Sequence, residues 1–172
     1  MDITVKFTIA TEQGTDTLMM LTEQIALEKF SQLVDAKILA GYIEENFSEK
    51  VLISELNSLS NQWLVVYVDE KPAGYARITS KGKMPESLYQ KRSIRIADFG
   101  IRSRYSSDPA IRKSLIDKCL EVCKSHDAIW INEYSDSPLL PFFESEGFLR
   151  DKIIYGYDDL PLRSVVLIKN QE

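Results

Sequence analysis

Histidine and cysteine are almost absent from this 172-residue chain. His126 is the only histidine, which excludes a cluster of imidazole metal ligands. The two cysteines, Cys119 and Cys123, are four residues apart in a helical pattern, without the CxxC spacing of zinc or redox sites. That spacing places both on one helix face, where cysteine packs as a small apolar residue. We therefore expect neither a metal site nor cysteine chemistry.

Long apolar runs and an excess of positive charge are also missing. No apolar stretch approaches the roughly 18 residues of a membrane span, and the N-terminus lacks the basic and apolar segments of a signal peptide. These absences predict a cytoplasmic protein without a membrane partner. The net charge of −5 argues against nucleic acid, because phosphate binding needs a basic patch, and it suits a cationic or amine-bearing substrate.

The composition that is present is typical of a soluble globular protein. Apolar residues make up 44% of the chain and charged residues 27%, which argues against disorder. No internal repeat and no Pro/Gly-rich linker divides the sequence. A single domain over residues 1–172 is therefore expected.

Apolar periodicity predicts an alternation of strands and helices. Strands are expected at Ile3–Ala10, Trp63–Val68, Ala73–Thr79, Ile94–Ile101, Ala128–Asn132, Ile153–Tyr157 and Ser164–Ile168. Helices are expected from about Asp16 to Val34, over Leu39 to Leu59 with a break near Ser48, at Asp108–Lys124, and at Pro138–Glu146 up to Gly147. This order predicts an α/β sandwich on a mixed sheet, parallel in its middle where one helix crosses over between two strands.

Four segments in this order resemble landmarks of the GNAT superfamily, the acyl-coenzyme-A-dependent N-acyltransferases. They are the hairpin LVVYVDEKPAGYARIT, the strand IRIADFGI, the passage RSRYSSDPAIRKSLIDKCLEVCK and the segment WINEYSDSPLLPFFESEGF. The resemblance implies a mixed sheet with helices on both faces and central parallel strands splayed apart. It also implies acetyl-coenzyme A as cosubstrate, and the layout is most similar to bacterial acetyltransferases that act on polyamines and related small amines.

The resemblance places coenzyme A along the IRIADFGI strand and the following passage. The residues that it implies for this role are Phe99, Gly100, Ile101, Ser106, Ser107, Ala110, Ile111, Arg112, Lys113 and Phe143. Gly100 has a physical meaning of its own, because glycine inside a strand marks a bulge or a close approach. Either the strand bulges there and, as the resemblance implies, frees an N–H for the thioester carbonyl, or Gly100 accommodates a bulky neighbour such as Tyr134.

The segment expected to bind the phosphates of coenzyme A departs from the family pattern. The family has a Gly-rich loop before this helix, whereas Ala110 and Arg112 stand at the matching positions and Asp108 is a good N-cap. A capping carboxylate would occupy the N–H groups that a phosphate needs. Basic side chains near the helix start could donate hydrogen bonds to the phosphates instead, or they could form only a solvated face. They are Arg102, Arg104, Arg112 and Lys113.

Acid–base groups are also incomplete relative to the family, because Phe143 stands where a tyrosine often donates a proton and Pro138 stands for an asparagine. Acyl transfer to an amine needs a group that takes the amine's proton. Asp98 is the best-placed carboxylate, on the same strand face as Gly100. Glu133 lies at the end of the next strand, and Tyr134 is a substitute acid. A structural hydrogen bond is the alternative role of each.

The resulting hypothesis is an N-acetyltransferase that moves an acetyl group directly from acetyl-coenzyme A to a small primary amine. The rival hypothesis is a GNAT-fold ligand-binding or interaction module that has lost catalysis. Neither hypothesis involves nucleic acid, and the sequence leaves a homodimer open.

Overall fold

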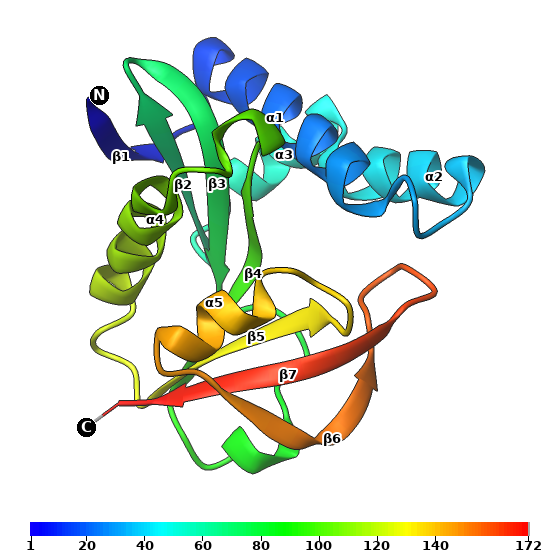
Figure 1. Cartoon of the computed structure of the whole chain (residues 1–172), viewed down its shortest axis with the longest axis vertical. Helices are drawn as coiled ribbons and strands as arrows, with labels where there is room; N and C mark the ends of the chain where they lie inside the picture. The colour runs from blue at the N-terminus through cyan, green and yellow to red at the C-terminus, as the bar shows by residue number, and fades with distance from the viewer. Residues whose placement is uncertain (172) are drawn as a thin grey trace.

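The computed structural model describes residues 1–171, and a seven-stranded sheet runs through it (Figure 1). The strand order is β1-β2-β3-β4-β5-β7-β6, and every neighbouring pair is antiparallel except β4 and β5. The strands are β1 Ile3–Thr8, β2 Asn61–Val68, β3 Lys71–Thr79, β4 Ser93–Ile101, β5 Ala128–Tyr134, β6 Leu149–Gly156 and β7 Arg163–Asn170. The predicted mixed α/β sheet is confirmed.

Helices cover both faces of this sheet. Alternate residues of β2 show the two layers: Leu64 and Val66 pack toward α4 and α5, whereas Trp63 and Val65 pack toward α1, α2 and α3. Figure 1 shows these two groups of helices on opposite sides of the strands. The helices are α1 Glu12–Phe30, α2 Ala36–Phe47, α3 Glu49–Leu56, α4 Pro109–Val122 and α5 Leu140–Ser145.

Capping residues set where the N-terminal helices begin and end. The predicted break near Ser48 is confirmed, because Ser48 ends α2 in an extended conformation and its side chain caps α3 at the Val51 N–H. The start expected at Asp16 is wrong. Thr11 caps α1 instead, accepting from the Gly14 N–H at 3.0 Å, so the helix begins one turn earlier than its apolar stripe.

The central strands diverge as predicted. β4 and β5 pair in parallel only from Ser93 opposite Ala128 to Arg95 opposite Trp130. Beyond that point β4 stays paired with β3 and β5 stays paired with β7. The C-terminal halves of two adjacent strands therefore separate inside the sheet.

The bulge of β4 lies at Ala97 and not at Gly100. Arg77 of β3 is opposite Asp98 and Ile78 is opposite Ile96, which leaves Ala97 as the extra residue. The expected bulge at Gly100 is therefore wrong in position by three residues.

Helix α4 packs its predicted apolar stripe against the sheet. Leu115 and Cys119 are fully buried, and Phe148, after α5, is buried in the same cluster. Val122 is only partly buried, because it lies at the edge of the stripe, and Ile116 is buried in addition. Among the described residues, no helix has both the length and the apolar character needed to cross a bilayer.

Candidate functional site

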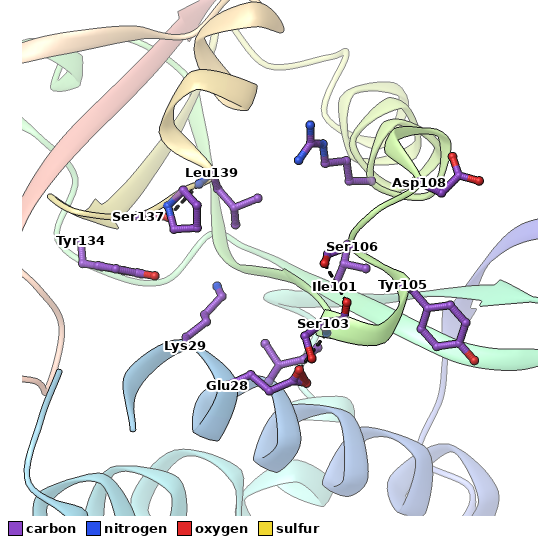
Figure 2. Close-up of a pocket in the computed structure, with 13 residues that line it drawn as sticks. Glu28, Lys29, Ile101, Ser103, Tyr105, Ser106, Asp108, Tyr134, Ser137 and Leu139 are labelled. Atoms are coloured by element: carbon purple, nitrogen blue, oxygen red, sulfur yellow. Dashed lines mark hydrogen bonds between the residues drawn. The ribbon is translucent and has the colours of Figure 1, made fainter. Parts of the chain in front are cut away.

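A cavity of about 390 Å³ opens where β4 and β5 have separated. It is bounded by α1, the end of β4, the loop into α4, the end of β5 and the loop into α5 (Figure 2). Its lining residues are Ile25, Glu28, Lys29, Ile101, Ser103, Tyr105, Ser106, Asp108, Arg112, Tyr134, Ser137, Pro138 and Leu139. Four of the candidates predicted from sequence are among them: Ile101, Ser106, Arg112 and Tyr134.

Lys29 brings a primary amine into this cavity from α1. Its Nζ donates to the Phe99 carbonyl at 2.6 Å, on the part of β4 that β5 no longer accompanies. Figure 2 shows the Lys29 side chain pointing into the space between Tyr134 and Ile101. A cation therefore holds the β4 backbone where the two strands have diverged.

Gly100 makes room for α1. A Cβ at this position would lie 2.6 Å from Ile25 Cγ2 and 3.3 Å from Lys29 Cε. The neighbours that Gly100 accommodates are therefore Ile25 and Lys29, and the expected neighbour Tyr134 is wrong. The glycine lets the helix lie close to β4 and lets Lys29 reach the Phe99 carbonyl.

Tyr134 lines the cavity at the end of β5, and Glu133 precedes it on the same strand. Glu133 is 4% exposed, and burial raises the pKa of its carboxyl, although the nearby Lys29 ammonium and the Tyr134 N–H act in the opposite direction. Burial also raises the pKa of the Tyr134 hydroxyl, so this phenol stays protonated at neutral pH. A phenol and an amine thus line the cavity, and a buried carboxyl that interacts with the amine lies on the adjacent residue of β5.

Carboxylates hold the backbone of the loop that leads from β4 into α4. Glu28 Oε2 accepts from the Ser103 N–H at 2.7 Å, and Asp108 Oδ1 accepts from the Ala110 N–H at 2.9 Å. The Ser106 hydroxyl donates to the Ser103 carbonyl at 2.7 Å. The predicted cap by Asp108 is confirmed. Both N–H groups are therefore already engaged at the place where the resemblance implies phosphate binding.

The four basic residues near this loop have separate environments. Arg112 lines the cavity with its guanidinium 4.9 Å from the centre of the Phe142 ring, and its buried Nε has no hydrogen-bond partner within residues 1–171. Lys113 pairs instead with Asp117 and Glu146, and Arg102 lies 3.8 Å from Glu28. Of the expected cationic group, only Arg112 faces the cavity.

The other coenzyme-A candidates lie away from the cavity lining. Phe143 and Ile111 are buried in the core, and Phe143 packs edge-on against Phe99 with ring centres 5.3 Å apart. Lys113, Ser107 and Ala110 are exposed at the start of α4. Of the ten coenzyme-A candidates, only Ile101, Ser106 and Arg112 therefore line the cavity.

Asp98 lies in a second, polar pocket of about 440 Å³ on the α1–α3 side of the sheet. Its Oδ2 accepts from Arg77 Nε at 3.0 Å, and Arg77 also lies 3.5 Å from Glu55. Five carboxylates and three basic groups line this pocket: Glu45, Glu55, Asp98, Asp158 and Asp159, with Arg77, Lys81 and Arg95.

Two tyrosines lie between the cavity and the polar pocket. Tyr134 lines the cavity, Tyr157 lines the polar pocket, and their rings meet edge to face at 6.0 Å. The two catalytic candidates from sequence, Tyr134 and Asp98, therefore face different spaces on either side of this contact.

Lys29 and Glu28 were missed by the sequence analysis. Lys29 follows Leu18, Leu21 and Ile25 at helical spacing, so a lysine interrupts an otherwise apolar stripe. That interruption was the available signal. Within residues 1–171, no group of three or more His, Cys, Asp or Glu side chains is placed to hold a metal ion.

No protein-family model matches the sequence, but solved structures match nearly its whole length. PaiA N-acetyltransferase from Thermoplasma acidophilum, solved in complex with coenzyme A, is 13% identical with a TM-score of 0.79 over 99% of both chains. A GCN5-related N-acetyltransferase from Rhodopseudomonas palustris is 10% identical, with a TM-score of 0.71 over 99% of this chain and 96% of that one. This chain has the GNAT fold. The ribosomal-protein-S18-alanine N-acetyltransferase of Escherichia coli is 11% identical, with a TM-score of 0.67 over 98% of this chain and 94% of that one.

The GNAT fold confirms the architecture expected from the four sequence landmarks. The splayed strands correspond to β4 and β5, and the cavity lies between their diverging ends. At these identities the likeness concerns the fold, and one fold can support many different reactions.

Proposed function

We propose that this protein is an N-acetyltransferase that uses acetyl-coenzyme A and a small cationic amine. The observation that carries the proposal is the pair of spaces beside the diverging strands, a cavity on the loop side and an acidic pocket beyond Tyr134 and Tyr157. Acyl transfer by direct attack needs two sites that meet at one point, one for each substrate.

The residues of the cavity suit both the thioester arm and the phosphates of coenzyme A. The diverged part of β4 offers backbone groups to the thioester arm, and Arg112 offers a charged donor whose Nε is buried and unpartnered within residues 1–171. A guanidinium binds phosphate with short, charge-assisted hydrogen bonds. When bound, acetyl-coenzyme A supplies an electrophilic thioester carbonyl and a thiolate leaving group.

The chain's own groups would move the protons. Glu133 is a buried carboxyl whose raised pKa brings it closer to neutral pH, as a general base requires. Tyr134 keeps its proton and can donate it to the leaving sulfur. Asp98 is already engaged by Arg77, so its role in the proposal is to attract and orient the amine. Both cysteines are buried, Cys119 on α4 and Cys123 directly after it, which favours transfer without an acyl-cysteine intermediate.

The acceptor is proposed from charge. Five carboxylates against three basic groups give the polar pocket an excess of negative charge, which favours a cationic amine over an anionic acceptor. The resemblance of the sequence implies polyamines and related small amines, so these amines belong in the first assay. Peptide N-termini and amino sugars complete the panel.

Calorimetric titration with acetyl-coenzyme A, followed by thiol release across the amine panel, tests the proposal. Arg112→Ala should weaken binding by roughly tenfold or more, because a hydrogen bond to a charged group contributes about 1.5–3 kcal/mol. Arg150→Ala is the matched control, since Arg150 is exposed and pairs with Glu144 outside the cavity. Equal affinities of the two variants would contradict the assignment of Arg112.

A second candidate function rests on the loop into α4. Glu28 and Asp108 already occupy the Ser103 and Ala110 N–H groups, which favours a binding module without catalysis. Absence of heat on titration to millimolar acetyl-coenzyme A, with the fold intact, would select this candidate over the enzyme.

A further inference from the structure

Lys29 is a primary amine held inside the cavity proposed for the thioester. Its Nζ lies 2.6 Å from the Phe99 carbonyl, and the vacant position of Gly100 lies 3.6 Å from the same nitrogen. Primary amines are the acceptors in the proposed reaction, and this one is attached to the protein at the diverging strands. The enzyme therefore carries a potential acceptor of its own.

We propose that Lys29 is a self-acylation site, modified by the acyl thioester bound beside β4. This inference rests on the proposed function, because acetyl-coenzyme A has to enter the cavity first. The helix fixes the Lys29 stem through Ile25, which is 3% exposed and packs one turn earlier against Gly100. Such fixed proximity raises the rate of an intramolecular reaction far above that of a free amine.

The chemistry balances with the groups present and the one cosubstrate. The Lys29 ammonium leaves the Phe99 carbonyl and gives one proton to the Glu133 carboxylate, which exposes the nitrogen lone pair. That lone pair forms an N–C bond with the thioester carbonyl carbon, the C–S bond breaks, and its electron pair leaves with sulfur. The second proton lost from nitrogen protonates the thiolate. An ammonium and a thioester become an amide, a free thiol and one proton.

Acylation of Lys29 would change the cavity in two ways. The amide is neutral, so the cation that offsets the burial of Glu133 is lost. The added acyl group would also occupy volume within a cavity of about 390 Å³. Because the acyl group fills part of the space that the ligand needs, modified protein should bind acetyl-coenzyme A more weakly than unmodified protein, and the modification acts as a brake on the enzyme.

Peptide mapping by mass spectrometry after incubation with acetyl-coenzyme A tests the inference. Lys37, exposed near the start of α2, is the internal control for reaction of a free surface lysine. We expect Lys29 to gain the mass of one acetyl group at least about tenfold faster than Lys37. Excess free coenzyme A should protect Lys29 and leave Lys37 unaffected. Glu133→Gln should slow labelling of Lys29 alone.

Variants and binding data separate this inference from the proposed function. Lys29→Arg should abolish the rapid adduct, whereas Lys37→Arg should leave it intact. If acetyl-coenzyme A binds and a small amine is acetylated while Lys29 reacts no faster than Lys37, the self-acylation inference is overturned and the enzyme stands. If calorimetry detects no binding of acetyl-coenzyme A, both proposals fail.

Discussion

Substitution of Gly100 by alanine tests the close approach of α1 to β4. The new Cβ would lie 2.6 Å from Ile25 Cγ2, a separation at which the Ile25 side chain or the backbone of α1 or β4 has to shift. Lys29 Cε, at 3.3 Å, would also have to give way. Gly100 does not have a positive φ, so backbone strain plays no part and the effect is one of packing.

The expected magnitude combines two opposing effects. Overpacking a buried position destabilises a protein by about 1–3 kcal/mol, because neighbours leave their preferred rotamers and the backbone shifts. Replacing glycine by alanine also restricts the unfolded chain, which stabilises by about 0.4–1 kcal/mol. The net prediction for Gly100→Ala is a loss of about 1–2 kcal/mol in the free energy of unfolding. The midpoint of thermal unfolding should fall by about 2–8 °C for a domain of this size.

Gly41 supplies the matched control. It lies inside α2, is exposed, and a Cβ there would meet nothing within 4 Å. Gly41→Ala should therefore stabilise the protein by up to about 1 kcal/mol through helix propensity. Urea unfolding followed by circular dichroism measures both variants, and the two substitutions are expected to have opposite signs.

A double mutant identifies the contact responsible. Ile25→Ala removes the methyl group nearest to Gly100, so Gly100→Ala should destabilise the Ile25→Ala background less than it destabilises the wild type. A neutral Gly100→Ala, or additive effects of the two substitutions, would refute the close approach of α1 to β4.

Three further predictions concern ionisable groups. Asp108→Asn keeps an N-cap and removes a carboxylate, so coenzyme-A affinity should rise about fivefold with less than about 0.5 kcal/mol change in stability; unchanged affinity in calorimetry would show that Asp108 only caps the helix. Burial raises the pKa of Glu133, so its contribution to stability is complete below the ordinary glutamate pKa, near 4.5, and is lost as pH rises through the raised value. Glu133→Gln should therefore gain stability over the wild type in urea melts as pH rises above the ordinary glutamate pKa, and parallel pH profiles would contradict this. Burial raises the pKa of the Cys119 thiol above its ordinary range and that of Cys123 to about 12, so both should react with a thiol reagent only on unfolding; rapid labelling of native protein would disprove their burial.

Local signals predicted the architecture well. Ser48 marks the boundary between two helices because a serine hydroxyl caps a helix from an extended conformation. Gly147 ends α5 with a φ of +95°, which glycine adopts without steric penalty. Asp108 caps α4 through its side chain, as Ser48 caps α3. Each of these depends on residues adjacent in sequence, so the pattern alone is informative.

The site was predicted less well because it depends on distant contacts. Lys29 and Phe99 are seventy residues apart in sequence and meet only when α1 packs on β4. Glu28 reaches the Ser103 N–H by the same packing. A motif identifies the strand and the loop, but it does not identify which side chain of another helix occupies their backbone groups. Phe143 shows the converse, since a motif position can be filled by a core residue.

Lys29 and the thioester arm of coenzyme A would compete for the same backbone carbonyl, that of Phe99. Strand divergence removes β5 from β4 beyond Arg95, and Lys29 donates to the Phe99 carbonyl there. A thioester arm that pairs with the same stretch of β4 has to displace this ammonium, and a hydrogen bond to a charged group contributes about 1.5–3 kcal/mol. Lys29→Met keeps the apolar stem and removes the donor, and water can bind the carbonyl in the free protein at little cost, so the variant should tighten coenzyme-A binding by about tenfold or more. Weaker binding by Lys29→Met in calorimetry would instead mean that Lys29 contacts the ligand and assists its entry.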